Sequence, residues 1–469
     1  MCVLLSCLLL TACAETGEGV PQHNVILMMV DTLRADHLSS YGYSRTTSPN
    51  LDAFAAANLR FADVRSQAAC TSPSVSSLLA SKNPLTLLQQ PSGHIGIPKD
   101  VPSLAQFLKL ADYWTVAISA SPIVRKTPSE ANRFGEFDAG FDVFHEECFM
   151  SDARCVNDAA LEALEVMTEP FFLYLHYMDV HAPYDPPADF ERPFSNNESV
   201  EPLVRMGRSE QFQAETLQAG EQVQPLEISH FRDLYDDEIA FFDAEFKNLI
   251  DALEARELLD PSIIVIASDH GEAFQEQNYL GHCRIPLFEA MTSTPLVMHI
   301  PGVSRSDPVR AEAQNLDITP TILDYVGFDI AGLDLDGVSL RPAIETDRAV
   351  NSHTFSIQGV EVTASDARRT LTYNLESGRQ ALFDRIEDPG HQHPLDDPED
   401  AGSRALRQQL DAWLGDRTRD EDTDVARDAR RLEDELRALG YIQSVEAPSG
   451  ARSPSGLLPE SARGHATGE

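Results

Sequence analysis

The run Asn24-Val-Ile-Leu-Met-Met-Val30, followed directly by Asp31, decides the fold of this chain. An unbroken apolar stretch of this length is typical of a strand that is buried on both faces of a parallel sheet. In open α/β sheets, ligands bind beyond the carboxyl ends of the strands, so a carboxylate at this position is well placed for chemistry. The sequence therefore predicts a central strand that delivers Asp31 to a site.

Apolar runs of the same kind recur along the chain. They cover residues 114–119, 170–176, 262–268 and 294–300. Helical segments are expected between them, for example at 103–111 and at 235–257, where apolar residues recur at helical spacing. Strands that alternate with helices predict an α/β fold, a doubly wound sheet with helices on both faces.

The charge balance restricts the partners of the protein. The 469 residues include 36 Lys and Arg against 75 Asp and Glu, a formal net charge of −39. Such a surface repels nucleic acids and anionic membranes, so no nucleic-acid partner is expected. An anionic substrate would need a metal ion or a helix dipole at the site to overcome this field.

The first residues resemble an export signal. Residues 1–13 form a short apolar segment, too short to span a bilayer, that ends in Leu10-Thr-Ala-Cys13 and matches a bacterial lipobox. A cleaved and lipidated Cys13 would make the protein a bacterial lipoprotein, secreted across the inner membrane to the periplasm or cell surface and held to a membrane only by its lipid anchor. The usual basic residues are missing, so either the true start lies upstream or the match is accidental.

Five segments are expected along the chain. They are a signal segment, a linker, the catalytic α/β domain, a small C-terminal α+β subdomain, and a charged helix with a disordered tail, at residues 1–13, 14–23, 24–337, 338–414 and 415–469. The subdomain is predicted to contain three short strands and a closing helix, at 354–357, 369–373, 380–384 and 402–414. Residues 186–229 are acidic and lack a clear period, so we interpret them as a long insertion over the site.

Cysteine usage leaves two alternatives open. Removal of the signal and lipidation of Cys13 would leave Cys70, Cys148, Cys155 and Cys283. In an oxidising compartment the close pair Cys148 and Cys155 could form a disulfide, and a pair of free thiols is the alternative.

The stretch Ala69-Cys-Thr-Ser-Pro-Ser-Val-Ser-Ser-Leu-Leu-Ala-Ser81 contains the candidate nucleophile. Thr71 and Ser72 are good helix N-caps, and Pro73 suits the first helical position. At a helix N-terminus, free N–H groups and the helix dipole would stabilise a bound tetrahedral anion and a developing alkoxide on Thr71. An ordinary helix cap is the alternative interpretation.

Polar residues that follow the predicted strands complete a site. They are Asp31, His176, Asp179, His181, Asp269 and His270. Asp31, Asp269 and His270 are suitable ligands for a single metal ion. The Thr71 oxygen would complete the coordination shell. The candidates for substrate binding are His176, Asp179 and Ser72. Taken singly, each of these residues has a structural alternative, such as a helix cap, a core histidine or a turn.

With these motifs the chain resembles the sulfatase family of the alkaline phosphatase superfamily. The matching stretches are Val30-Asp-Thr-Leu-Arg-Ala-Asp-His-Leu38, Tyr41-Gly-Tyr43, Thr46-Thr-Ser-Pro-Asn-Leu51, Thr71-Ser-Pro-Ser74, Leu78-Leu79, Gly140-Phe-Asp142, His181-Ala-Pro-Tyr184, Tyr235-Asp-Asp-Glu-Ile239, Asp243, Ser268-Asp-His-Gly-Glu272 and Gly281-His282. The similarity spans roughly residues 24–414, and the order and spacing of so many motifs make it specific at family level.

The resemblance implies an alkaline-phosphatase-like fold, a three-layer sandwich around a mostly parallel sheet with a small C-terminal α+β subdomain. The metal ligands that it implies are Asp31, Asp269 and His270. Thr71 would occupy the position of the nucleophile. His181 and His282 would act in catalysis near the charged or leaving oxygens of the substrate.

Several positions depart from the family's pattern. The sulfatase signature is Cys/Ser-x-Pro-x-Arg, whose first residue is oxidised to formylglycine, but here the first residue is Thr71 and the last is Val75. Threonine cannot give that aldehyde, so no formylglycine is expected, and Cys70 lies one residue out of register. Thr32 replaces a second acidic residue, His270 stands where calcium-dependent sulfatases usually carry Asn, and the Gly-Lys-x-His segment that grips sulfate is not found.

A Thr nucleophile with an Asp-His metal pair is the pattern of phosphoryl-handling relatives. The leading hypothesis is therefore a metal-dependent hydrolase or transferase of sulfate- or phosphate-type esters that favours phosphoesters. The alternatives are a true sulfuric ester hydrolase and a catalytically silent envelope binding protein. One divalent ion is expected, Mn or Zn before Ca or Mg, because a His ligand suits borderline cations. The substrate is expected to be an anionic ester of a glycan, a lipid or a small molecule.

Overall fold

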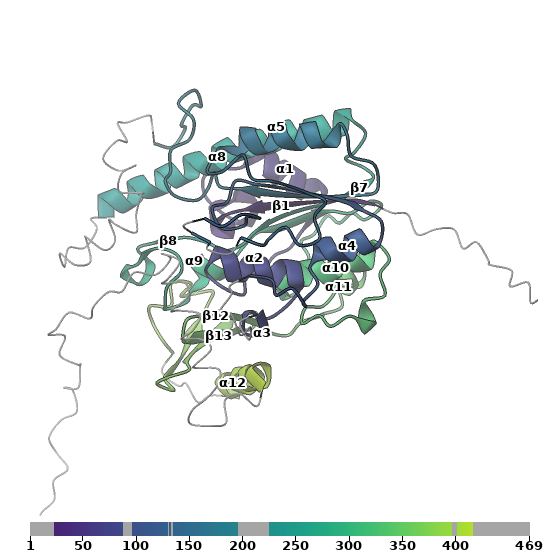
Figure 1. Ribbon diagram of the computed structural model, residues 1–469. Helices are drawn as coiled ribbons and strands as arrows, with labels where there is room; N and C mark the ends of the chain where they lie inside the picture. The colour runs from purple at the N-terminus through teal and green to yellow at the C-terminus, as the bar shows by residue number, and fades with distance from the viewer. Residues whose placement is uncertain are drawn as a thin grey trace, which may run out of the picture.

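A seven-stranded sheet forms the centre of the molecule (Figure 1). The computed structural model describes residues 23–87, 96–129, 131–132, 135–195, 225–395 and 401–415. In spatial order the strands are β2 (Leu59–Arg60), β10 (Leu296–His299), β7 (Ser262–Ser268), β1 (Asn24–Val30), β6 (Phe171–Tyr177), β4 (Trp114–Ser119) and β5 (Val143–His145). The strands from β7 to β5 run parallel, whereas β10 pairs antiparallel with both β7 and the edge strand β2. The predicted mostly parallel sheet is confirmed.

β1 is buried on both faces, as its unbroken apolar sequence predicts. Its alternate residues Val25, Leu27 and Met29 belong to one hydrophobic core. The residues between them, Ile26 and Met28, belong to the other core together with the last residue of the strand. Because side chains alternate across a strand, a strand between two helix layers needs apolar residues at every position.

Helices cover both faces of the sheet and give three layers (Figure 1). One layer contains α1 (Pro49–Ala57), α5 (Ala153–Leu164) and α8 (Pro225–Ala255). The opposite layer contains α2 (Thr71–Ala80), α4 (Leu104–Leu110), α10 (Ile318–Tyr325) and α11 (Arg341–Thr346). This arrangement confirms the three-layer α/β sandwich. Within the part of the chain that the structure describes, no helix is both long and apolar enough to cross a bilayer.

A smaller antiparallel sheet follows the main one in sequence. It is formed by β12 (Thr354–Gln358), β13 (Glu361–Ser365), β14 (Arg369–Asn374) and β15 (Gln380–Asp384), and α12 (Ala401–Leu414) packs against it. The strands β12, β14 and β15 and the helix were predicted, but β13 was missed. This strand places only Val362 and Ala364 in the core of the small sheet, so its short sequence gives little apolar signal.

α4 and α12 begin within one residue of the predicted positions, but two other helices begin at residues that change an interpretation. α8 begins at Pro225 rather than at residue 235, so residues 225–229 belong to this helix and not to an insertion. α2 begins at Thr71 with Cys70 as its N-cap, which makes Pro73 the third helical residue instead of the first.

Several predictions fall outside the described residues. They concern the lipobox at Cys13, the insertion over 196–224 and the charged tail from residue 416.

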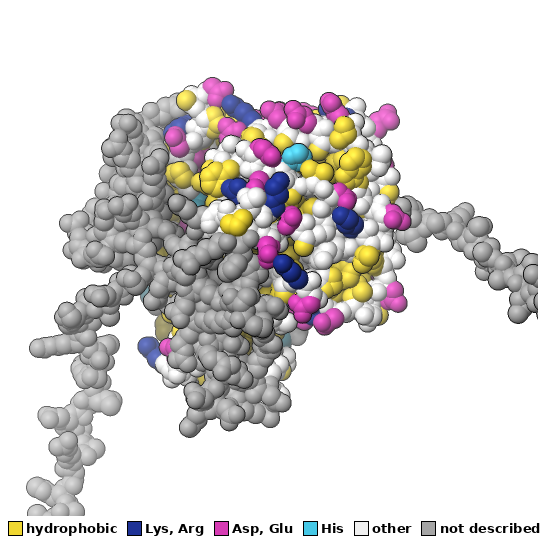
Figure 2. Space-filling view, viewed as in Figure 1, with side chains coloured by type: hydrophobic (Ala, Val, Ile, Leu, Met, Phe, Trp, Pro, Cys, Tyr) yellow, Lys and Arg dark blue, Asp and Glu magenta, His cyan; other side chains and the backbone are white. Residues whose placement is uncertain are grey.

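Acidic side chains are spread over the described surface of the face shown in Figure 2, among basic and apolar groups. They do not gather at one spot on the visible part of this face.

Candidate active site

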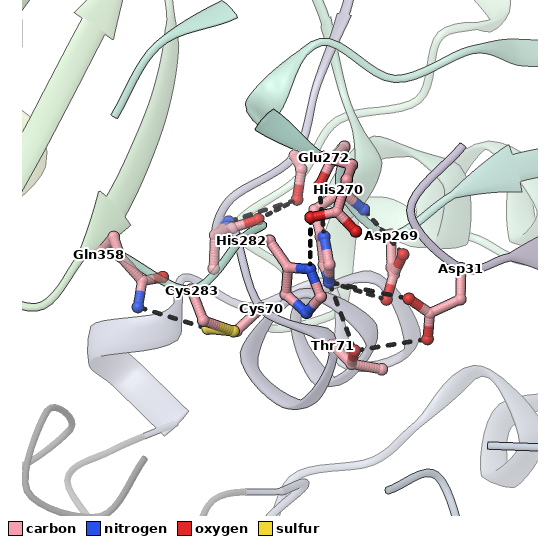
Figure 3. Close-up of a disulfide and its surroundings, with 12 residues drawn as sticks. Asp31, Cys70, Thr71, Asp269, His270, Glu272, His282, Cys283 and Gln358 are labelled. Carbon is pink, nitrogen blue, oxygen red and sulfur yellow. Dashed lines mark hydrogen bonds and ion pairs between the residues drawn. A yellow bond between two sulfur atoms is a disulfide. The ribbon is translucent and has the colours of Figure 1, made fainter. Parts of the chain in front are cut away.

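Three potential metal ligands meet at the carboxyl ends of β1 and β7 (Figure 3). These neighbouring parallel strands pair in register up to Val30 and Ser268, so the residues that follow them lie side by side. Those residues are Asp31 on one strand and Asp269 and His270 on the other. The three side chains are buried, and they offer ligand atoms within 4.8 Å of one another.

Hydrogen bonds around these side chains leave one ligand atom of each available. Oδ1 of Asp269 accepts from the backbone N–H groups of Thr32 at 3.1 Å and His270 at 2.8 Å, whereas its Oδ2 is buried without a hydrogen bond and lies 3.5 Å from Nε2 of His270. Oδ1 of Asp31 is also buried without a partner. Nδ1 of His270 lies 3.0 Å from the carbonyl oxygen of Gly271, so Nδ1 donates and Nε2 keeps its lone pair.

The electrostatics of the cluster fit a bound cation. Burial raises the pKa of Asp269, and the charge of Asp31 raises it further. Burial also raises the pKa of Asp31, but a hydrogen bond from His176 and the nearby histidines bring it below its usual value. Burial lowers the pKa of His270, which keeps the imidazole neutral. Two unpartnered carboxylate oxygens and a neutral imidazole nitrogen form a donor set that suits one divalent ion.

Thr71 places a hydroxyl group beside this cluster. It is the first residue of α2, a helix whose ten residues are all buried. Its Oγ1 lies 3.4 Å from Oδ2 of Asp31 and 3.3 Å from Nε2 of His270. The hydroxyl of Ser74 donates to the backbone carbonyl of Asp269 and so ties the first turn of α2 to the end of β7. The structure therefore brings the four predicted ligand residues together.

His176 was predicted to bind substrate, but it lies behind Asp31. Its Nε2 is 3.2 Å from Oδ2 of Asp31, its Nδ1 is 2.8 Å from the hydroxyl of Tyr174, and its exposed fraction is 0%. Both ring nitrogens are therefore occupied within the protein. This corrects the prediction, because these contacts let His176 orient a metal ligand instead.

Asp179 and Ser72 were the other candidates for substrate binding. Oδ1 of Asp179 accepts from the backbone N–H of Ala153 at 2.8 Å, so this carboxyl lies at the start of α5 and outside the ligand cluster. Burial raises its pKa to about 7. Ser72 is the second residue of α2 and is buried. Its contact with substrate stays a prediction.

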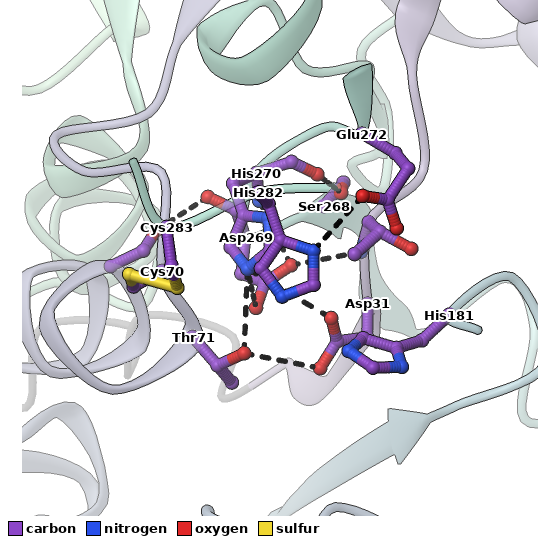
Figure 4. Close-up of polar contacts among 12 residues, drawn as sticks. Asp31, Cys70, Thr71, His181, Ser268, Asp269, His270, Glu272, His282 and Cys283 are labelled. Carbon is purple, nitrogen blue, oxygen red and sulfur yellow. Dashed lines mark hydrogen bonds and ion pairs between the residues drawn. A yellow bond between two sulfur atoms is a disulfide. The ribbon is translucent and has the colours of Figure 1, made fainter. Parts of the chain in front are cut away.

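His181 and His282 lie beside the cluster (Figure 4). The ring centroid of His282 is 4.6 Å from that of His270 and 5.0 Å from that of His181. Nδ1 of His181 lies 2.6 Å from the carbonyl oxygen of Ala182, so Nδ1 donates, and among the described residues Nε2 has no hydrogen-bond partner. The two predicted catalytic histidines are therefore in contact with each other.

Glu272 holds His282 in place. Its Oε1 is 3.1 Å from Nδ1 of His282, and its Oε2 accepts from the hydroxyl of Tyr184 at 3.1 Å. Burial lowers the pKa of His282, but the charge and hydrogen bond of Glu272 raise it to about 9, so the ring is protonated at neutral pH. This role was not predicted, although the motif that contains Glu272 was recognised.

Comparisons with known proteins place the chain in a family. A profile of the Sulfatase family matches residues 23–328. The chain belongs to the sulfatase family. Human iduronate 2-sulfatase is 24% identical over 361 residues, which cover 65% of this chain and 64% of that protein. The match thus spans less than two thirds of that relative. Bovine arylsulfatase A is 23% identical over 447 residues, 80% of this chain and 84% of that protein.

Solved structures share the fold of this sulfatase-family protein. The phosphonate monoester hydrolase of Agrobacterium radiobacter has a TM-score of 0.65 at 17% sequence identity. The match covers 84% of this chain and 94% of the chain of that hydrolase. A protein solved in complex with its substrate D-glucosamine-2-N,6-O-disulfate has a TM-score of 0.64 at 17% sequence identity. This match covers 89% of this chain and 98% of that protein's chain. At these identities the likeness shows the fold alone. The family is metal-dependent, in agreement with the ligand cluster.

Two disulfides lie in the described part of this sulfatase-family chain. Cys148 bonds to Cys155, which was one of the two alternatives left open by the sequence. Cys70 bonds to Cys283 across 213 residues, a pairing that no short spacing could reveal (Figure 3). As a disulfide partner, Cys70 does not offer the free thiol that conversion to formylglycine requires.

Proposed function

We propose that this sulfatase-family protein hydrolyses or transfers anionic esters through attack by Thr71, and that it favours phosphoesters, diesters in particular, over sulfate esters. One observation carries the proposal. The hydroxyl of Thr71, at the first turn of a buried helix, lies 3.3 Å from Nε2 of His270 and 3.4 Å from Oδ2 of Asp31. A nucleophilic oxygen therefore shares one site with the candidate metal ligands.

The metal site would neutralise charge on the transferred group. Asp31, Asp269 and His270 would hold one divalent ion, which supplies Lewis-acid stabilisation when bound. The histidine ligand favours Mn or Zn over Ca or Mg. Backbone N–H groups at the start of α2 and the dipole of this helix add further stabilisation of the developing negative charge.

Asp31 and two histidines would handle the protons. Oγ1 of Thr71 attacks the central phosphorus or sulfur atom opposite the leaving oxygen, the bond to that oxygen breaks, and the hydroxyl proton of Thr71 passes to Oδ2 of Asp31, its acceptor at 3.4 Å. His282, held through Nδ1 by Glu272, donates its Nε2 proton to that oxygen. Nε2 of His181 is free to accept a proton from the water or acceptor alcohol that clears Thr71 in the second step.

The chemistry of that second step favours phosphorus. A formylglycine hydrate sheds sulfate by eliminating to the aldehyde, so turnover needs no attack on sulfur. Thr71 offers no such exit, and its ester must be cleaved by water or an alcohol. The structural neighbours include a phosphonate monoester hydrolase, so the same fold serves phosphorus esters in another protein. The sulfatase relatives support a sulfuric ester hydrolase as the second candidate.

Activity measurements on three ester classes test the proposal. Purified wild type, Thr71→Ala and Thr71→Ser are assayed on an aryl sulfate, an aryl phosphomonoester and an aryl phosphodiester with Mn or Zn supplied. We expect phosphodiester turnover by the wild type, partial turnover by Thr71→Ser, and none by Thr71→Ala.

The controls are metal content and the circular-dichroism spectrum, which should stay close to those of the wild type. Preferred turnover of the aryl sulfate would refute the substrate class, and turnover by Thr71→Ala would refute the nucleophile. A wild type that is inert on all three esters would favour the catalytically silent alternative.

A further inference from the structure

We propose that the Cys70–Cys283 disulfide is a positioning device that fixes His282 relative to Thr71. The inference rests on the proposed function, because it assigns these cysteines a part in the same reaction. Cys70 directly precedes Thr71, and Cys283 directly follows His282 (Figure 4). The covalent bond therefore joins the backbone of the nucleophile to the backbone of the proposed acid through adjacent residues.

A second contact runs parallel to the covalent bond. The backbone N–H of Cys283 donates to the carbonyl oxygen of Ala69 at 2.8 Å, and the Cα atoms of the two cysteines are 4.9 Å apart. The segment that carries His282 is thus clamped directly onto the entry to α2. A shift of this segment would change the distance from His282 to the leaving oxygen but leave the metal ligands in place.

Local structure alone gives the segment little rigidity. Around His282 it contains only β8 (Ala273–Phe274), β9 (Leu280–Gly281) and a single 3₁₀ turn at Glu276–Asn278. Cys283 itself has φ 65°, in the left-handed region that favours glycine. Such a conformation persists where tertiary contacts impose it, and here the disulfide is one of those contacts.

The disulfide itself is buried and packed against the C-terminal sheet. Cys70 and Cys283 are 0% and 1% exposed, and they share a hydrophobic cluster with Leu85 and Ile357. The side-chain amide of Gln358 donates to Sγ of Cys70 at 3.4 Å (Figure 3). The small C-terminal sheet therefore packs against the disulfide, and Glu272 fixes the ring of His282 by a hydrogen bond to Nδ1.

Removal of the disulfide should affect the chemical step more than substrate binding. Reduction by a dithiol such as dithiothreitol breaks only the S–S bond: two electrons and two protons convert Cys70 and Cys283 to thiols, and the reagent closes to a cyclic disulfide. Neither Thr71 nor His282 changes chemically. Because misplacement of a catalytic group by about 1 Å costs up to ~100-fold in rate, we expect kcat to fall about tenfold or more with KM changed less than about threefold.

The test compares Cys70→Ser/Cys283→Ser with the matched control Cys148→Ser/Cys155→Ser, which removes the other disulfide. One readout needs no activity: hydrogen–deuterium exchange of residues 279–288, followed by mass spectrometry. The others are kcat and KM on the best ester, with metal content and circular dichroism as checks of folding. We expect faster exchange in this segment and a lower kcat for the first variant only.

Failure of this proposal and failure of the proposed function give different results. Unchanged exchange and kcat in Cys70→Ser/Cys283→Ser, or equal changes in the control, would overturn it. If the wild type turns over no ester, the proposed function fails, and the exchange data still decide whether the disulfide holds the segment. Should Cys70→Ser/Cys283→Ser not fold, the same measurements on folded Cys148→Ser/Cys155→Ser before and after dithiothreitol replace it, with reduction of Cys70 and Cys283 verified by thiol alkylation and mass spectrometry; equal values in the reduced protein would overturn the proposal.

Discussion

Two buried carboxylates, Asp31 and Asp269, determine what the site can bind. Each has one oxygen saturated by hydrogen bonds and one without a partner, and the unpartnered oxygens belong to the same cluster as Nε2 of His270. Ionised groups in a protein interior cost several kcal/mol where their charge is incompletely compensated. A bound divalent ion removes this cost, so metal binding should be linked to the stability of the fold.

Asp269→Asn tests this link. The amide oxygen can still accept from the backbone N–H groups of Thr32 and His270, but the negative charge is lost. We expect the melting temperature of the wild type to rise on addition of Mn or Zn, and that of the variant to stay unchanged. Thermal unfolding with and without a chelator measures both. The control is Asp179→Asn, which changes a buried carboxyl outside the cluster. A metal-dependent rise in the melting temperature of Asp269→Asn equal to that of the wild type would contradict the assignment.

At the scale of elements, long buried strands could be predicted and short edge strands could not. β1 and β7 contact two cores, so their residues 25–30 and 263–267 are all apolar. β2 and β5 cover only Leu59–Arg60 and Val143–His145, too short for any pattern. Asp31, Asp269 and His270 were predicted because they follow the long strands.

The tether between Glu272 and His282 and the Cys70–Cys283 disulfide were missed for a different reason. These contacts join the segment around β9 to groups elsewhere in the chain. The backbone of this segment is irregular, so its sequence shows no helical or strand periodicity. Their geometry follows only from the assembled fold.

Asp179 at the start of α5 gives the fold a predictable pH dependence. Burial raises its pKa in the folded state to about 7, whereas an unfolded Asp has a pKa of about 3.9. Folding therefore takes up a proton between these values, and the stability contributed by the protonated carboxyl is lost as the pH rises toward and through 7.

We expect the free energy of unfolding of the wild type to fall between pH 5 and pH 8 by on the order of 1–3 kcal/mol more than that of Asp179→Asn. Urea unfolding at both pH values measures this difference. An identical pH dependence in the two proteins would show that Asp179 is ionised throughout.

For the whole molecule, the formal net charge of −39 opposes attraction to anionic lipid. We propose that the protein is nevertheless a bacterial lipoprotein of the periplasm or cell surface, held by acyl chains on Cys13 in the lipobox Leu10–Cys13. Both disulfides are compatible with an oxidising compartment.

Cys13→Ala should move the protein from the membrane fraction to the soluble fraction. Fractionation of expressing cells measures this, and mass spectrometry of the mature N-terminus is the complementary check. A wild type that is already soluble, or that keeps residues before Cys13, would rule out the lipid anchor.

The central claim is that Thr71 forms the covalent intermediate, and rapid acid quenching of the reaction tests it most directly. A phosphodiester reaction of the metal-loaded wild type is stopped within one turnover, and peptide mass spectrometry locates the adduct. The account predicts an adduct on Thr71 in which the phosphorus keeps the ester group that did not leave, and this adduct forms and decays at the rate of turnover and is absent from Thr71→Ala. A turnover-linked adduct on any other residue, or turnover by Thr71→Ala at the wild-type rate, would contradict it.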